Sequence, residues 1–116
     1  MCIRDSADNT MRGFPVSSGK ITAKASVILG PTEFDNMEPG TILVSPLTTP
    51  AWTQLFAHAV GLVTDVGSIL ALGSIVAREY GIPAVLGVGN GTKRIRHGQT
   101  ITIDGDRGIV EIHEES

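Results

Sequence analysis

A glycine-containing turn that leads into a short helix is the part of the sequence best suited to chemistry. The stretch "TDVGSILALGSIVAREYG" starts at residue 64, and a helix that follows such a turn leaves its first backbone N–H groups unpaired. Together with the helix dipole, these groups favour an anion such as phosphate. An alternative interpretation, favoured by spacing alone, is a tight strand-to-helix connection without a ligand. The residues expected to bind phosphate are Gly67, Ser68, Gly73, Ser74 and Arg78.

Leu72 stands at the exit of this turn, where a reactive side chain would project toward a bound anion. A leucine side chain has no lone pair, so it neither attacks an electrophile nor binds a metal. The residue types therefore predict a binding turn that lacks a catalytic group.

The three histidines do not complete a second site. His58 has no Asp, Glu or Cys three or four residues away, so we interpret it as structural. His97 and His113 fall in a loop and in the tail, fit no metal motif by spacing, and are expected to be solvated. The carboxylates are not clustered as a divalent cation would require, so no metal site is predicted in this chain.

A second glycine-rich segment, "GVGNG" at residues 87–91, superficially resembles a dinucleotide-binding loop. It is followed by "TKRIRHGQ" and a predicted strand, and not by a helix whose N-terminus would hold a pyrophosphate. We therefore interpret it as a plain turn.

Short strands are predicted along most of the chain. Apolar alternation near residues 21–27 and a β-branched run at residues 41–45 indicate two strands, both with the character of an antiparallel sheet. Two buried strands are expected within 61–66 and 84–88, and a hairpin with arms 100–103 and 109–112.

Two helices are predicted between these strands. The first has Thr49 as N-cap, Pro50 at its first position and Gly61 just past its end. Its apolar spacing predicts that Trp52, Leu55, Phe56 and Ala59 face the core. The second runs from about Gly73 to Tyr80, with Gly81 and Pro83 as stop signals. The whole is expected to be a strand-rich α/β domain.

Composition limits the class of protein. The chain has 116 residues, 41% of them hydrophobic, which fits one compact domain and excludes a second. A net charge of -3, with no basic run beyond "KRIRH" at residues 93–97, argues against nucleic-acid binding. No apolar run reaches the roughly 20 residues of a membrane span. We therefore expect a soluble protein. A lone cysteine, Cys2, excludes an internal disulfide, and we expect the protein to be cytoplasmic.

The first residues have the character of a scar. "MCIRDS" resembles the translation of a transposase-adapter end, so we interpret residues 1–6 as adapter-derived; the alternative is a genuine disordered N-terminus. Residues 7–12 are then a disordered lead-in, residues 13–113 the domain and residues 114–116 a tail. On this interpretation the chain is a C-terminal piece of a longer protein.

Several stretches carry a resemblance to a known family. "TDVGSILALGSIVAREYGIPAVLGVGNGT", followed by "GQTITIDGDRGIVEI", resembles the mobile phosphohistidine domain of the PEP-utilising enzymes. The likeness extends over residues 13–112, with "GFPVSSGKITAKASVI" at its start and "PLTTPAWTQLF" in its middle. "SIVAREYGIPAVLG" is its most specific run, and the nearest branch is that of PEP synthase and rifampicin phosphotransferase.

The resemblance implies a fold, a role and partners. The fold would be α/β, of the swivelling β/β/α phosphohistidine type. The role would be to accept a phosphoryl group on a histidine, whose neutral ring nitrogen is a good nucleophile, and to deliver it to a second substrate. The partners would be an ATP-grasp nucleotide-binding domain and a substrate-binding domain of the parent chain. ATP or PEP and Mg²⁺ would act there, and this domain would need no cofactor of its own.

Two positions depart from the family's pattern. The phosphoacceptor histidine falls on Leu72, and Thr49 stands where related sequences commonly have Asp. One base change converts a His codon into a Leu codon, so an error or chance variant is one explanation of Leu72. Genuine loss of phosphotransfer is the second. The third is structural, because Leu72, Ile75, Val76 and Glu79 follow helical spacing and leucine would extend an apolar stripe inward.

Two functions follow from these observations. In the first, the chain is a phosphoryl-carrier domain of a PEP-utilising phosphotransferase, inactive as written because of Leu72. In the second, it is a non-catalytic docking or regulatory module derived from the same domain. An ATP-grasp domain encoded upstream in the parent gene would favour the first, and a free-standing gene the second.

Overall fold

Strands make up most of the regular structure. The computed structural model describes residues 10–47, 52–67, 72–89 and 91–113. The strands in this part of the chain are β1 (Thr10–Arg12), β2 (Phe14–Ser17), β3 (Lys20–Val27), β4 (Thr41–Ser45), β5 (Ala59–Thr64), β6 (Ala84–Leu86), β7 (Thr100–Asp104) and β8 (Ile109–Ile112). The helical segments there are the 3₁₀ helix η1 (Pro31–Asn36) and the helices α2 (Thr53–Phe56), α3 (Leu72–Tyr80) and α4 (Gly91–Arg94).

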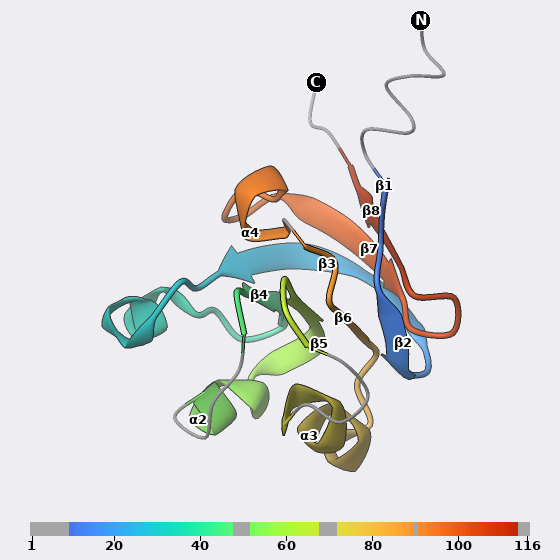
Figure 1. The fold of residues 1–116 in the computed structure, drawn as a ribbon. Helices are drawn as coiled ribbons and strands as arrows, with labels where there is room; N and C mark the ends of the chain where they lie inside the picture. Colours follow the sequence, from blue (N-terminus) through green and yellow to red (C-terminus); the bar gives the residue numbers. More distant parts are fainter. Residues whose placement is uncertain (1–9, 48–51, 68–71, 90, 114–116) are drawn as a thin grey trace, which may run out of the picture.

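The strands form one mixed sheet with a parallel centre (Figure 1). Strands β3, β4, β5 and β6 pair in parallel, in this order. On the β3 side, β7 pairs antiparallel with β3, β8 with β7, and β1 with β8. On the other side, β2 pairs antiparallel with β6. The predicted antiparallel character of residues 41–45 is wrong, because β4 pairs in parallel on both sides. The physical reason is that all five residues of β4 are buried, as expected for a strand covered on both faces.

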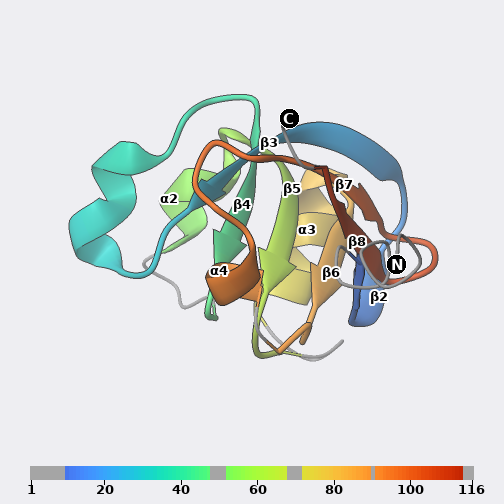
Figure 2. The same cartoon turned by 90° about the horizontal axis from the view of Figure 1, so that it is seen from above.

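Two segments are shared between the parallel and antiparallel halves of the sheet. Residues 20–24 of β3 pair with β7, and residues 25–27 pair with β4. Strands β1 and β2 follow each other across Gly13, yet β1 pairs with β8 and β2 with β6. The sheet therefore folds back on itself, and β7 and β8 form a second layer over the parallel strands (Figures 1 and 2).

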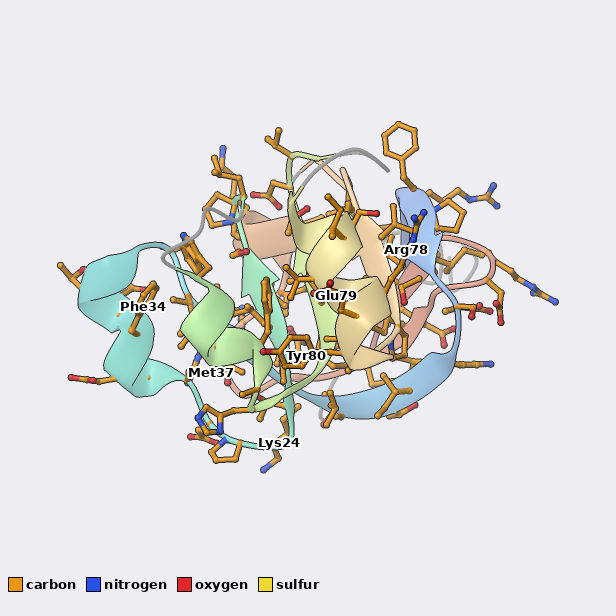
Figure 3. All side chains as sticks on the ribbon, turned by 90° about the horizontal axis from the view of Figure 1, so that it is seen from below. Lys24, Phe34, Met37, Arg78, Glu79 and Tyr80 are labelled. Carbon is orange, nitrogen blue, oxygen red and sulfur yellow. The ribbon has the colours of Figure 1, made fainter. Side chains whose placement is uncertain are left out.

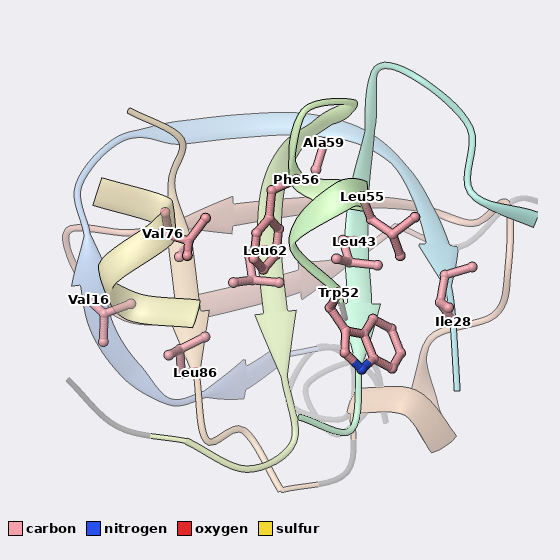
Figure 4. Packing of buried hydrophobic residues seen from close by; sticks show 12 residues of the cluster. Val16, Ile28, Leu43, Trp52, Leu55, Phe56, Ala59, Leu62, Val76 and Leu86 are labelled. Atoms are coloured by element: carbon pink, nitrogen blue, oxygen red, sulfur yellow. The ribbon is translucent and has the colours of Figure 1, made fainter. Parts of the chain in front are cut away.

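Side-chain alternation along the parallel strands divides the core in two. On β4, Leu43 belongs to one cluster and Ile42 and Val44 to the other. The cluster under the helices is drawn in Figure 4 and consists of Val16, Ile28, Leu43, Trp52, Leu55, Phe56, Ala59, Leu62, Val76, Ala77, Ala84 and Leu86. The cluster between the two strand layers consists of Met11, Ala25, Ile42, Val44, Val63, Val85, Ile95, Ile101, Ile103, Val110 and Ile112.

The helices cover the face of the parallel strands that points away from β7 and β8. Figure 1 shows α2 and α3 on this face, and Phe56 of α2 meets Tyr80 of α3 edge to face, with ring centroids 6.4 Å apart. The order of layers is thus helix, parallel strands and antiparallel strands. This arrangement confirms the predicted α/β domain of β/β/α type with short helices.

The first predicted helix is much shorter than expected. Helix α2 covers only Thr53–Phe56, and Thr49 and Pro50 lie outside the described residues. Trp52, Leu55 and Phe56 are buried as predicted, but Ala59 is the first residue of β5. The helix stops because the main chain turns into the sheet, where the His58 carbonyl accepts the Gly40 N–H at 2.8 Å.

Other predictions are confirmed, with one correction at the N-terminal end. The hairpin forms as β7 and β8, and α3 ends at Gly81, whose φ is 71°. The predicted disordered lead-in at residues 7–12 is wrong for Thr10–Arg12, because these residues form β1 and pair with β8. Residues 7–9, the predicted scar at residues 1–6 and the tail at 114–116 lie outside the described residues.

The packing between the strand layers leaves no space for a side chain at Gly61. A Cβ atom there would lie 2.5 Å from Ile103 Cδ1 and 3.3 Å from Ile42 Cγ1. We expect Gly61→Ala to lower the free energy of unfolding by about 1–3 kcal/mol, because the buried Ile103 side chain, whose terminal methyl group is the closest contact, would have to leave its rotamer. Urea denaturation measures this loss. Gly30→Ala is the control, because no heavy atom lies within 4 Å and φ is -173°, and equal effects of the two changes would contradict the packing.

Candidate functional site

The connections that leave β4, β5 and β6 meet at one edge of the molecule. The three strands are parallel and end together, as the arrowheads in Figure 2 show. We call this the carboxyl edge and define it by residues 45–47, 65–67 and 87–89. Ligands of open parallel sheets bind at such edges. The glycine-containing turn singled out in the sequence leaves β5 here.

Backbone hydrogen bonds hold the start of this turn from both sides. On one side, the N–H groups of Asp65 and Val66 donate to the carbonyl oxygens of Ser45 and Pro46, at 3.1 and 2.9 Å. On the other, the N–H groups of Val88 and Gly89 donate to the carbonyl oxygens of residues 64 and 65, at 3.0 and 2.9 Å. Residues 64–66 are therefore fixed by their neighbours' main chains.

Asp65 adds a side-chain clamp that the sequence analysis missed. Its Oδ1 accepts the Thr92 N–H at 3.0 Å, and its Oδ2 accepts the Thr92 hydroxyl at 2.6 Å. The clamp joins the connection after β5 to helix α4, which follows β6. The only signal in the sequence was an acidic residue directly after a buried strand, and it does not reveal a partner 27 residues away.

The main chain at Gly67 lies very close to Gly87. Gly67 has a φ of 144°, and its carbonyl oxygen would lie 2.7 Å from a Cβ atom on Gly87. The ring of Phe14 lies against the same position, with Cδ2 at 3.0 Å from that Cβ. Only glycine at residue 87 leaves room for both groups.

Helix α3 begins at the residue that the sequence analysis singled out. Leu72 is its first described residue and Gly73 its second. Ser68 and the rest of the turn, residues 68–71, lie outside the described residues. The connection that leads to residue 72 leaves β5 at the carboxyl edge, and the placement of residue 72 in a phosphate-binding turn stays a prediction.

Two buried hydroxyl groups near this edge have no partner within the described part of the chain. Ser74 in the first turn of α3 and Ser45 at the end of β4 are fully buried, and neither Oγ makes a hydrogen bond there. Ser45 follows Leu43 by two residues, so it points to the helix-covered face of the sheet. Buried polar groups are usually paired, so such hydroxyls are typical of a site that takes up water or a ligand.

Arg78 links α3 to the neighbouring strand. Its Nε donates to the Val16 carbonyl oxygen at 2.9 Å, and Figure 3 shows its side chain on the side of α3 that faces β2. This contact anchors the helix, and the predicted contribution of Arg78 to phosphate binding stays a prediction. The predicted apolar stripe of α3 is wrong, because Ile75 is 51% exposed and Glu79 is exposed. The helix instead buries Ser74, Val76 and Ala77.

The histidines do not gather at the carboxyl edge. His58 is exposed in the turn before β5. His97 is exposed and its Nδ1 accepts the Val27 N–H at 3.1 Å, while His113 is exposed and its Nε2 lies 2.6 Å from the Thr102 hydroxyl oxygen. Within the described ranges no group of three or more His, Cys, Asp or Glu side chains could hold a metal ion. No described helix is long and apolar enough to cross a membrane.

The segment after β6 differs from its predicted form. A one-turn helix, α4, follows "GVGN", where the sequence predicted no helix before the next strand. The prediction failed because the helix depends on the distant Asp65, which accepts the hydrogen bonds of Thr92 in its first turn. The Asp65 carboxylate already accepts the Thr92 N–H at the start of α4, where a dinucleotide-binding loop would bind a pyrophosphate. The segment is therefore still not interpreted as a dinucleotide-binding loop.

Exposed apolar side chains lie on and near the carboxyl edge. Of the six large hydrophobic residues that are exposed in the described chain, Leu47 and Val66 belong to this edge, and Val66 is 64% exposed. The ring of Phe14 lies against the Gly87 position of the same edge, and Ile75 belongs to the first described turn of α3. We call Phe14, Leu47, Val66 and Ile75 the apolar rim.

Comparisons with known proteins agree on one family. The family model of the PEP-utilising enzyme mobile domain matches residues 37–108. A rifampicin phosphotransferase of Streptomyces sviceus is 47% identical over 108 residues, which cover 93% of this chain and 12% of that protein. A phosphoenolpyruvate synthase of Aeropyrum pernix is 43% identical over 101 residues, covering 86% and 12%.

A solved structure supports the same assignment. The solution structure of an Enzyme I protein superposes with a TM-score of 0.61 at 30% identity, covering 72% of this chain and 34% of that one. The chain spans only about an eighth of the length of the curated relatives. Those relatives are multidomain phosphotransferases in which this domain is a small part.

The clamp between Asp65 and Thr92 is open to a direct test. Asp65→Ala removes both acceptors of Thr92, and we expect it to lower the free energy of unfolding by about 1–2 kcal/mol, because a part-buried N–H and a hydroxyl lose their partner. The Thr92 amide should also exchange its hydrogen faster, which NMR measures. Asp106→Ala is the matched control, because that carboxylate is exposed and we expect a change within about 0.5 kcal/mol. Unchanged exchange at Thr92 would contradict the clamp.

Proposed function

This chain belongs to the family of PEP-utilising enzyme mobile domains, and we propose that it is the phosphoryl-carrier domain of a multidomain phosphotransferase, inactive as written because Leu72 replaces the phosphoacceptor. The carrier would move phosphate between a nucleotide or PEP site and a second substrate. The observation that carries the proposal is the position of residue 72. It is the first described residue of α3, and the connection that leads to it starts at the carboxyl edge, where β4, β5 and β6 end.

A histidine at this position would be suited to carry phosphate. Its neutral ring nitrogen would attack the donor's phosphorus, and the bond from phosphorus to the leaving oxygen would break with its electron pair. In the return step the acceptor's oxygen would attack the same phosphorus, and the N–P bond would break. The positive end of the α3 dipole would stabilise the negative phosphoryl oxygens in both steps. Leucine permits neither step.

The phosphate-binding residues proposed around position 72 are those expected from the sequence. Ser74 has a buried hydroxyl without a partner among the described residues, which supports a role in binding. The N–H groups at the start of α3, including that of Gly73, would bind oxygen atoms. Gly67 shapes the entry of the turn, and Ser68 and Arg78 complete the proposed set.

The rest of the reaction would depend on other domains. The relatives are about eight times longer than this chain, which supports further domains in the parent protein, and we propose that these are an ATP-grasp nucleotide-binding domain and a substrate-binding domain. ATP or PEP and Mg²⁺ would bind there, and the apolar rim would contact those domains. We further propose that the chain is a C-terminal fragment of such an enzyme and that the enzyme is cytoplasmic.

A non-catalytic docking module is the second candidate. Leucine at residue 72 favours it, because this side chain has no lone pair to accept a phosphoryl group, while the apolar rim would support docking in either case. Both candidates share the contact surface and differ only in whether a histidine at residue 72 restores transfer.

Restoring the histidine separates the two candidates. We expect Leu72→His to become labelled when the chain replaces the mobile domain of the Streptomyces sviceus rifampicin phosphotransferase and the hybrid receives ATP labelled on its β and γ phosphates. The label should be lost in acid and kept in alkali, as a phosphoramidate is. The unchanged chain should stay unlabelled.

A misplaced histidine is the control for this experiment. Glu79→His puts an imidazole on an exposed position of the same helix, two turns after residue 72 and outside the apolar rim. It should take up no label. A folded Leu72→His hybrid without label would refute the carrier function, and equal labelling of both variants would refute the assignment of position 72.

A further inference from the structure

A short basic segment next to the carboxyl edge has no role in the function proposed above. Residues 93–97, "KRIRH", hold three of the nine Lys and Arg residues of a chain whose net charge is -3. No Asp or Glu occurs in the sequence between Glu79 and Asp104. We call residues 93–97 the basic loop.

Hydrogen bonds and one buried side chain hold the basic loop in place. Ile95 is 2% exposed, belongs to the core between the strand layers, and donates its N–H to the Gly91 carbonyl oxygen at 2.8 Å. The Arg96 N–H donates to Gln99 Oε1 at 3.0 Å, and His97 accepts the Val27 N–H. The Asp65 clamp fixes the start of α4. The loop therefore presents its charges in one arrangement.

The cations of this loop are not neutralised within the domain. Lys93 and Arg96 are exposed and Arg94 is half-buried, and none of the three forms an ion pair with a described carboxylate. The nearby carboxylate of Asp65 is occupied by Thr92. In Figure 1, α4 lies on the opposite face of the parallel strands from α3, and it packs against β4 and β5. The basic loop thus extends from one side of the carboxyl edge.

We propose that the basic loop docks against an acidic protein surface on the domain that receives the carboxyl edge; this inference rests on the proposed carrier function. Apolar contact at the rim would give affinity, and the charges to one side would fix the orientation of docking and speed the encounter. The partner would carry Asp and Glu side chains opposite residues 93–96.

The arrangement of the cations favours a protein surface over a phosphate group. Lys93 and Arg94 are consecutive residues of a helical turn, so their side chains diverge by about 100°. Ile95 points into the core between Arg94 and Arg96 and separates them further. A phosphate site needs donors that converge, whereas these spread over an area. No aromatic residue follows Tyr80 in the sequence, so the loop lacks the stacking side chains of a single-strand nucleic-acid site.

Charge reversal in the labelled hybrid tests the proposal. In the Leu72→His hybrid described above, we expect Lys93→Glu, Arg94→Glu and Arg96→Glu together to slow labelling about tenfold at low salt, because attraction becomes repulsion. The difference should disappear near 1 M salt, where charges are screened within about 3 Å. Thr92 and Ile95 stay unchanged, so a thermal melt of the isolated chain checks that the fold is kept.

A matched reversal on another surface completes the design. Lys20→Glu with Lys24→Glu reverses two charges on β3, and it should change the rate less than twofold. Equal slowing by both sets, slowing that salt does not relieve, or no slowing would overturn the proposal. A Leu72→His hybrid without label would instead refute the carrier function, and the proposal with it. Tripolyphosphate added to the isolated chain should not shift the amide signals of residues 92–97 below millimolar concentration, and tight binding there would overturn the choice of an acidic protein surface.

Discussion

The sharing of β3 between two sets of partners is the constraint on which the rest of the structure depends. Up to Lys24 the strand pairs antiparallel with β7, and from Ala25 onward it pairs parallel with β4. Where the strand changes partners, the Ala25 N–H donates to the Gln99 carbonyl oxygen, and the Ala25 carbonyl oxygen accepts the Gly98 N–H. Both backbone groups of this buried residue are therefore hydrogen-bonded. Because one strand belongs to both layers, the layers face each other and enclose the cluster that contains Ile42, Ile101 and Ile103.

The edge that carries the candidate site is built largely from main chain. Hydrogen bonds with the connections after β4 and β6 hold residues 64–66, the Thr64 hydroxyl donates to the Val66 carbonyl oxygen at 2.8 Å, and the Asp65 carboxylate binds Thr92. The next residue, Gly67, meets Gly87 at a distance that excludes any other side chain there. These contacts join residues 64–67, 87–89 and 92, so the described part of the edge is held without any group of the proposed phosphoacceptor position.

Local signals in the sequence were sufficient where an element ends on a special residue. Gly81 with Pro83 fixed the end of α3, and the turn at residues 104–108 fixed the hairpin. They failed where a distant contact decides: Ala59 fits both a helical stripe and a strand, and only pairing with Thr41 places it in β5. Parallel pairing of β4, the strand at Thr10–Arg12 and helix α4 likewise depend on partners far away in the sequence. In the site, the start of α3 near residue 73 could be predicted from local signals, the role of residue 72 stays a prediction, and the Asp65 clamp could not be predicted.

The pairing of β1 with β8 brings the first and last described strands together. Thr10 lies opposite Glu111 in this pair, and Figure 1 shows both strands leaving the molecule on the side away from α3. When the two ends of a folded unit are adjacent, a host chain that enters and leaves through them has almost no gap to close, so the loop-closure entropy is small. Insertion between two segments of a longer polypeptide would therefore cost this fold little stability.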